Sequence, residues 1–425
     1  MTKIRWILNR LRRTLMVHVA SYAVMGLIVA ALASLATNYL PWALPFEIST
    51  DAIDSLLTII ATSMLTITTF SLGALTSAYS SATSNGTARA TGLLTEDEIV
   101  QSSLATFVGS FLFSIVGLIA LKVSFYGPQG RALLFIVTLV VIAMIVVALL
   151  RLINQLTKLG RVADTISRIE NTAKEAMENR LQYPFLGGKS LPDVAHQARR
   201  GLPVRASTVG YVQFITIKLL ADICEQESLQ IDVLVLPGSF VYEDSLLAHI
   251  HSQGDVLPEG IEHLVHNAFE FGPNRSFDQD PRFGLIALTE VALRALSPAV
   301  NDPGTAIDVI GRQTRLLSYW GEAWAEAEKK EPEYPNVSVL PLIYEDMYED
   351  AFNLIARDGA AQIDVMSRLL KSLTALTRIG PMASRRAAQH QLDLAYERSL
   401  EALSTEAEKG RLKSIYKRAI EDAAA

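Results

Sequence analysis

The sequence is poor in charge and has almost no cysteine. Charged residues make up 19% of its 425 residues, whereas globular chains ordinarily carry about a quarter. A single cysteine, Cys224, excludes an intramolecular disulfide framework and is typical of a reducing compartment. The formal net charge is −6, and no dense basic stripe occurs outside the segments that flank apolar runs, which argues against a nucleic-acid partner.

Long stretches lack charge altogether. Apart from His18, no residue that ionises near neutral pH occurs in four runs, at 14–46, 55–88, 99–121 and 132–150. Each run has about 19 residues or more, which at about 1.5 Å per helical residue crosses the roughly 30 Å of hydrocarbon in a bilayer. A soluble enzyme is therefore excluded for the first third of the chain. The runs predict four transmembrane helices, at about 15–37, 55–79, 101–121 and 132–150.

Basic residues are distributed unevenly between the connections. The connection at 38–54 contains none, and the third loop has only Lys122 and Arg131 at its edges. The segments before the first span and after the fourth are rich in them: Lys3, Arg5, Arg10, Arg12, Arg13, Arg151, Lys158, Arg161 and Arg168. Because cytoplasmic loops retain Lys and Arg, this pattern predicts a multi-pass membrane protein with both termini in the cytoplasm. The first apolar run is too long for a signal peptide and is interpreted as a retained helix.

The remaining chain has an ordinary globular composition. We expect an integral membrane α-helical protein that also carries a cytoplasmic α+β domain. The predicted parts are a four-helix transmembrane domain at 1–152, an amphipathic helix and linker at 153–201, a β-containing subdomain at 202–257 and a helical subdomain at 258–425. The fourth span is expected to continue as one helix to about Tyr183-Pro184, because apolar residues recur at three- and four-residue steps. That apolar stripe would pack on its own cytoplasmic domain or on another subunit.

Two stretches carry a family resemblance. They are "DPRFGLIALTEVALRALSPAVNDPGTA" (Asp280 to Ala306) and "GYVQFITIKLLADICEQESLQIDVLVLPGSFVYEDSLLAHI" (Gly210 to Ile250). With the four preceding spans, they resemble the bacterial predicted membrane protein family catalogued as domain of unknown function 2254. The resemblance covers nearly the whole chain and implies an integral membrane protein with a cytoplasmic C-terminal domain. It implies no activity, since the family has none assigned.

The second span has a polar face. At about 100° per residue, seven positions fall within an arc of roughly 80°; they are Thr58, Thr62, Thr66, Thr69, Gly73, Thr76 and Ser80. Asp51 lies inside this arc and Asp54 about 40° outside it, which places an acidic pair at one end of a ladder of hydroxyls. The face could line a water-filled pore, pack tightly against another helix or face lipid. Asp51 could alternatively serve only as a helix cap.

The other spans have different signatures. Small residues four apart predict close helix packing in the first and third spans; they are Gly26, Ala30 and Ser34, then Ala105 with Gly109 and Ser110 with Ser114. The fourth span is almost wholly apolar and is expected to face lipid. Before the third span, Glu96, Asp97 and Glu98 follow Thr95, and Thr95-x-x-Glu98 matches a capping box. The alternative is an acidic ring at an inner pore mouth.

The cytoplasmic part offers few candidates for chemistry. Asp302-Pro303 and Asp280-Pro281 have the pattern of helix starts, with a capping carboxylate followed by proline. Glu290 and Arg294 are four apart and predict an ion pair. Four histidines come in two close pairs, but no further ligand spacing completes a metal site; they are His249, His251, His263 and His266. We therefore expect no catalytic residues, no metal and no cofactor.

These patterns favour a homo-oligomeric ion channel whose second helices ring a hydroxyl-lined pore. A tetramer or pentamer is expected, because one polar stripe cannot enclose water by itself. The acidic pair at the outer mouth favours small, monovalent cations. The alternative is a non-conducting, membrane-anchored sensor or scaffold whose cytoplasmic domain binds a partner.

Overall fold

The computed structural model describes residues 49–85, 97–123, 128–158, 161–191, 201–252 and 259–424, together with Val24, Ile28, Thr87 and Arg89. Most of the predicted first span, including Gly26, Ala30 and Ser34, lies outside the described residues, and so do Thr95 and Glu96. The described residues form two compact units. The apolar unit contains 49–84 and 89–165, and the mixed unit contains 85–87 and 166–424.

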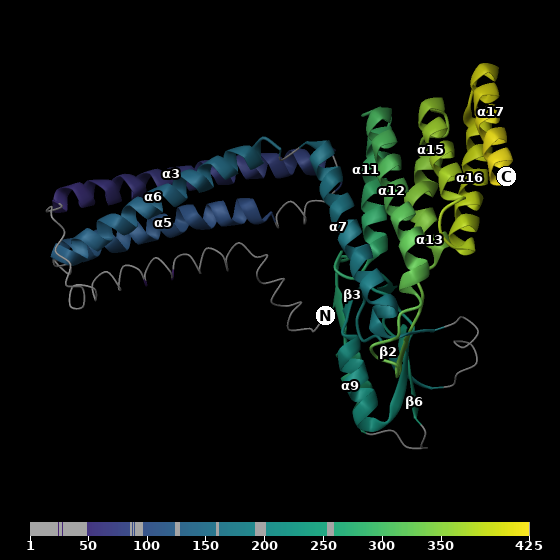
Figure 1. The fold of residues 1–425 in the computed structure, drawn as a ribbon, viewed down its shortest axis with the longest axis horizontal. Coiled ribbons are helices and arrows are strands. Elements are labelled where there is room, and N and C mark those ends of the chain that lie inside the picture. The colour runs from purple at the N-terminus through teal and green to yellow at the C-terminus, as the bar shows by residue number, and fades with distance from the viewer. Residues whose placement is uncertain are drawn as a thin grey trace. The chain divides into compact units, whose positions relative to one another are not determined.

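Three long helices build the apolar unit: α3 (Thr50–Asn85), α5 (Glu98–Lys122) and α6 (Pro128–Leu156). By length and composition each could cross a membrane, and each contains one of the predicted spans, so three of the four are confirmed as apolar helices. The helices run side by side (Figure 1). A Cβ at Gly117 of α5 would lie 3.0 Å from the Leu57 side chain of α3, so the backbone of α5 closely approaches α3.

The small residues of the third span lie where helix packing needs them. Ala105, Gly109, Ser110 and Ser114 are all buried on α5, which confirms the predicted packing face. Ser103 Oγ also donates a hydrogen bond to the Ala148 carbonyl oxygen of α6 (3.3 Å). Only 22% of the apolar window of α6 is buried in the described part of the chain, as expected for a lipid-facing helix.

The fourth span does not continue as one helix. α6 ends at Leu156, and a second helix, α7 (Val162–Gln182), begins after a break. The prediction of a continuous helix was therefore wrong, although its end at Tyr183-Pro184 is confirmed. After α6, Lys158 N donates to Gln155 O, which is an i→i+3 hydrogen bond typical of a helix end. The sequence between the two helices also contains Gly160, and glycine is common at helix ends.

The apolar stripe of α7 is buried at Ile166, Ile169, Ala173, Met177 and Leu181. It packs within its own unit, since a Cβ at Gly284 would meet the Ala173 side chain. Of the two predicted alternatives, the structure supports packing on the chain's own domain.

Two sheets lie at one end of the mixed unit. The five-stranded sheet has the order β1-β8-β4-β6-β2, with β8 parallel to β1 and β4. Its strands are β1 (Lys189–Ser190), β8 (Val337–Val339), β4 (Leu229–Val233), β6 (Leu246–Ser252) and β2 (Leu202–Arg205). The antiparallel three-stranded sheet contains β5 (Phe240–Val241), β3 (Gly210–Ile215) and β7 (Phe269–Gly272). Two short helices, α9 (Ile217–Glu227) and α10 (Ile261–His266), accompany them.

The strands β7 and β8 lie in the subdomain that was predicted to be helical. Each has four residues or fewer, too few to show a period in the sequence. The predicted helical subdomain at 258–425 therefore contributes a strand to each sheet.

The rest of the mixed unit is helical. Its elements are the 3-10 turn η2 (Pro184–Gly187), α11 (Pro281–Leu296), α12 (Pro303–Ala327), α13 (Tyr344–Tyr348), the π-helix η3 (Glu349–Asn353), α14 (Leu354–Asp358), α15 (Ile363–Leu376), α16 (Met382–Ala402) and α17 (Glu406–Ala424). Helices α11, α12, α15, α16 and α17 lie alongside one another (Figure 1). The helical stretch from Tyr344 to Leu376 is interrupted by the π-helix and by a turn at Gly359.

Candidate functional site

The hydroxyl face of α3 is exposed along its whole length. All seven predicted positions, from Thr58 to Ser80, are exposed in the described structure. Several hydroxyls donate to the carbonyl four residues earlier: Thr62 to Thr58 (2.9 Å), Thr66 to Thr62 (3.0 Å), Thr69 to Leu65 (3.0 Å) and Thr76 to Leu72 (2.8 Å). Because each hydroxyl has one hydrogen and two acceptor lone pairs, a face bonded in this way presents acceptor oxygens outward.

Apolar side chains border this face on both sides. Leu65 and Leu72 flank one edge, and Ile59 and Phe70 flank the other, with between 47% and 73% of each side chain exposed. The opposite side of α3, represented by Leu57, is buried in the apolar unit. The hydroxyl face is thus not used for packing within the described apolar unit. It remains available to a second copy, to water or to lipid.

A cation accompanies the acidic residues at the start of α3. Asp51 is exposed and Asp54 half-buried. Ser49 Oγ accepts a hydrogen bond from Ala52 N (3.2 Å) and so takes the capping role considered for Asp51. Arg131 Nη1 donates to Thr50 Oγ1 (2.8 Å). Sequence reasoning named Arg131 only at the edge of the third loop and missed its contact with Thr50, because the two residues are 81 positions apart.

The start of α5 does not form the predicted capping box. The helix begins at Glu98, and Asp97 caps it by accepting hydrogen bonds from Ile99 N (3.0 Å) and Val100 N (3.1 Å). The Asp97 carboxylate also accepts from Gln155 of α6. Since Asp97 is buried and bonded in this way, it fits a structural role better than an acidic mouth. Glu98 is exposed, and Glu96 lies outside the described residues.

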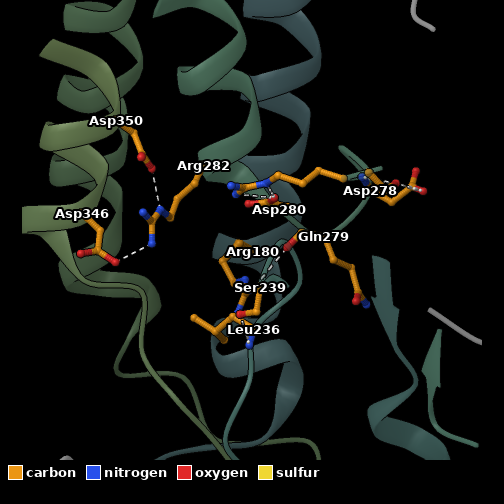
Figure 2. Close-up of polar contacts among 11 residues, drawn as sticks. Arg180, Leu236, Ser239, Asp278, Gln279, Asp280, Arg282, Asp346 and Asp350 are labelled. Atoms are coloured by element: carbon orange, nitrogen blue, oxygen red, sulfur yellow. Dashed lines mark hydrogen bonds and ion pairs between the residues drawn. The ribbon is translucent and has the colours of Figure 1, made fainter. Parts of the chain in front are cut away.

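The mixed unit contains a second cluster of charge, centred on Arg282 of α11. Its Nε donates to Asp350 Oδ2 (2.6 Å) and its Nη1 to Asp346 Oδ2 (2.5 Å), and Figure 2 shows the guanidinium pointing between the two carboxylates. Burial acts to lower the pKa of Arg282, but the bonds to Asp350 and Asp346 raise it above the ordinary value. Burial raises the pKa of Asp350, and Arg282 opposes that rise. This charge cluster ties α11 to α13 and the π-helix.

A buried threonine supports the π-helix. Thr289 Oγ1 lies 2.6 Å from the Asp350 carbonyl oxygen and 3.1 Å from that of Ala351. Gln313 Nε2 of α12 in turn donates to Thr289 Oγ1 (2.8 Å). A π-helix has i→i+5 hydrogen bonds in place of the regular i→i+4 bonds. Here the Thr289 hydroxyl of the neighbouring α11 is within hydrogen-bond distance of two of its carbonyl oxygens. No local sequence signal reveals this arrangement.

The two Asp-Pro motifs behave differently. Asp302 Oδ1 accepts from Thr305 N (3.1 Å), as predicted for a cap, and the hydrogen bonds from Thr305 lower the pKa of Asp302. Asp280 forms no side-chain cap. Its buried carboxylate pairs with Arg275 (2.7 Å), and a Cβ at Gly238, whose φ is +93°, would collide with this pair. The capping prediction for Asp280 was therefore wrong, because a nearby arginine competes for its carboxylate.

A buried arginine lies close to this pair. Arg180 of α7 donates to the Gln279 carbonyl oxygen (3.2 Å; Figure 2). Burial lowers its pKa to about 10, and the charge of Asp280 opposes the change. Glu290, for which an ion pair with Arg294 was predicted, accepts a hydrogen bond from Thr87 Oγ1 (2.7 Å). These contacts give structural roles to several residues of the stretch at 280–306 that carries the family resemblance.

The histidines are not gathered into a metal site. His251 Nε2 lies 2.9 Å from Asp232 Oδ2 on the neighbouring strand, and His266 Nε2 lies 3.0 Å from Ser207 Oγ. Within the part of the chain that the structure describes, no group of three or more His, Cys, Asp or Glu side chains could hold a metal ion.

Comparisons with known proteins agree with the membrane character of the chain. Uncharacterised proteins of Mycobacterium bovis and Mycobacterium tuberculosis are 33% identical to it over 116 residues. The match covers 26% of this chain and 22% of theirs, so the chain spans about a fifth of the length of these relatives. No solved structure matches it. The family described as predicted membrane protein DUF2254 matches residues 12–375. With its apolar helices and the motif around Arg282, the chain belongs to this membrane protein family.

Proposed function

We propose that this protein is a homo-oligomeric ion channel of the bacterial inner membrane, with α3 lining a pore for small, monovalent cations. The exposed hydroxyl face of α3 carries the proposal, because its seven positions remain uncovered while the opposite face is buried. The bonds to the preceding turns leave oxygen lone pairs facing outward. Such oxygens can replace part of a cation's hydration shell and still release the ion.

A ring of subunits follows from the width of the polar face. One stripe of roughly 80° cannot surround water, and a closed symmetric assembly supplies the missing walls. In a tetramer or pentamer, Leu65 and Leu72 on one edge would pack against Ile59 and Phe70 of the neighbouring α3. The apolar edges then bury each other, and the hydroxyls face the axis.

The charge at the start of α3 sets the expected ion preference. Asp51 is exposed and shares the hydroxyl face, whereas Arg131 is half-buried and bonded to Thr50. The carboxylates repeated around the axis would therefore concentrate cations at the mouth. With both termini in the cytoplasm, as the basic residues predict, this mouth faces outward.

Cysteine accessibility tests the pore directly. Cysteines placed singly at Thr62, Thr66 and Thr69 should react with a small hydrophilic thiol reagent in membranes. Cysteines at Val140 and Val147 of α6 should not, although the native side chains are 54% and 47% exposed, because we assign this side of α6 to lipid. Cys224 contributes little background, since burial raises the pKa of its thiol to about 12 and the thiolate is the reactive form.

The same experiment identifies the result that contradicts the pore. If all three positions on α3 are as unreactive as Val140 and Val147 in an intact oligomer, with the reagent shown to reach both sides, α3 lines no aqueous path. The alternative function, a non-conducting sensor or scaffold, would then be preferred. It draws support from the size of the mixed unit, which includes 166–424 and thus more than half of the chain. We propose neither catalysis nor a resident cofactor.

A further inference from the structure

A cavity of about 300 Å³ lies between α15 and α17 in the mixed unit. Lys371 of α15, Arg378 in the turn after α15 and Arg418 of α17 line it. The cations come together because the two helices run in the same direction: Arg411 Nη1 pairs with Asp364 Oδ1 (3.0 Å) near their first turns. Continuing along both helices from that pair leads to the cavity.

Part of the cavity lining is apolar. Ala375 and Ala419 contribute only methyl groups, and Ile415 is half-buried beside them. Two alanines on packed helices leave a hollow that larger side chains would fill. Thr374 completes the lining, and its hydroxyl donates to the Leu370 carbonyl oxygen (2.7 Å), so its oxygen can only accept a further bond.

Charge in this cavity has one sign. Among the described residues, no carboxylate lines it. Neither Lys371 nor Arg418 forms an ion pair with a carboxylate in the described part of the chain, whereas Lys417, beside Arg418, lies 3.8 Å from Glu421. Lys371, Arg378 and Arg418 are all exposed at the rim of this hollow, where like charges repel one another and a bound anion relieves that repulsion. Ammonium and guanidinium groups are the side chains that bind phosphate oxygens best.

We propose that the α15–α17 cavity binds a phosphate group, carried by a soluble phosphate ester or by a lipid headgroup. The cations hold the phosphate, and the alanines of the lining contact the first carbons attached to it. The volume is at the lower end of the range for small-molecule sites, about 300 Å³, and fits a ligand of that size. This site is independent of conduction and would exist in a channel or in a scaffold.

Calorimetry on the whole 425-residue chain in neutral detergent tests the site with two probes. Glycerol 3-phosphate represents a soluble ester, and dihexanoyl phosphatidic acid below its micelle concentration represents a headgroup. The double variant Lys371→Ala with Arg418→Ala should weaken binding by about tenfold or more, since it removes two phosphate-binding cations. The control, Arg368→Ala with Lys413→Ala, removes the same charge from exposed positions on the same two helices and should change affinity by about twofold or less, as screened surface charges do.

A third variant separates a cavity from a diffuse positive field. Ala375→Leu retains every charge and fills the hollow from an exposed position, so binding should be lost while circular dichroism shows an unchanged helix content. If one probe binds more tightly than the other and loses that binding in Ala375→Leu, that probe identifies whether the phosphate comes from a soluble ester or from a lipid headgroup. Binding of neither probe, equal losses in both double variants, or unchanged binding in Ala375→Leu would overturn the proposal.

Discussion

At the residue scale, Asp51 and Arg131 place opposite charges at the same end of the apolar unit. If the acidic mouth concentrates cations, Asp51→Asn with Asp54→Asn should lower the conductance of the purified protein in planar bilayers. The loss should be greatest at low salt, where the field is least screened. Arg131→Gln should act in the opposite direction and raise cation conductance, because it removes a positive charge that lies beside Thr50.

The two variants control for each other, since each changes the charge at the same end of the apolar unit. Equal conductance of the parent and both variants at every salt concentration would remove this end from ion selection. Anion selectivity in the parent would contradict the cation assignment altogether.

Arg282 offers a residue-scale test within the mixed unit. Arg282→Ala leaves the half-buried Asp350 carboxylate without this cation and should destabilise the unit by about 1–3 kcal/mol. Asp346→Ala should cost less, because 41% of that carboxylate side chain is exposed against 17% for Asp350. Guanidinium unfolding followed by tryptophan fluorescence measures both, since Trp320 and Trp324 are buried on α12.

The contact between Arg282 and Asp350 also determines how the destabilisation by Arg282→Ala should change with pH. Burial raises the pKa of Asp350, and Arg282 opposes that rise. Removing the arginine should therefore raise the pKa of Asp350 further. Protonation of Asp350 then relieves the unpaired charge, and the destabilisation by Arg282→Ala should shrink as the pH falls. An energetic cost that stays constant from neutral to acid pH, or an equal cost for the Asp346 variant, would contradict this assignment.

At the element scale, two helical glycines predict opposite outcomes. Gly284 of α11 lies against Ala173 of α7, and a Cβ there would be 2.9 Å from the Ala173 Cα. Gly284→Ala should therefore separate the helices and lower stability by roughly 1–3 kcal/mol. Gly311 of α12 has nothing within 4 Å of the point where a methyl group would lie, so Gly311→Ala should be neutral or stabilising by up to about 1 kcal/mol. Unfolding curves of the two variants check this; a stable Gly284→Ala would mean that α7 does not pack as described.

Elements with local signals could be predicted from the sequence. The three helices of the apolar unit follow from stretches without charge, and the exposed face of α3 from the spacing of its threonines. The strand β8 could not be predicted from the sequence, because Ser338 pairs with Lys189 and Asp232, each far away in the chain. The π-helix depends on Thr289 from another helix and has no pattern of its own.

The candidate site was predictable to a similar extent. The residues on the hydroxyl face were identified by periodicity alone, whereas the partner of Thr50 was not, since Arg131 is 81 residues away. Asp280 and Asp302 share the same Asp-Pro pattern, and only the presence of Arg275 beside one of them decides which becomes a cap. Tertiary neighbours, which a local pattern does not include, account for these differences.

At the scale of the whole molecule, the proposed pore requires several copies of the chain. Light scattering in mild detergent, corrected for bound detergent, should give a mass several times the 46.5 kDa of one chain. Four or five subunits are expected. A single-chain mass over a wide range of protein concentrations would contradict the pore, while leaving the phosphate site untouched.

The rate at which a reagent modifies Cys224 can report local opening of the mixed unit. It is the only cysteine in the sequence, it is 1% exposed on α9, and its Sγ lies 3.7 Å from the Asn336 carbonyl oxygen. A reagent in solution can therefore modify it only when α9 lifts from the sheet, and the modification rate reports how often the mixed unit opens. One thiol assay can thus follow the α3 positions within seconds and the opening of the mixed unit over hours, in the same preparation.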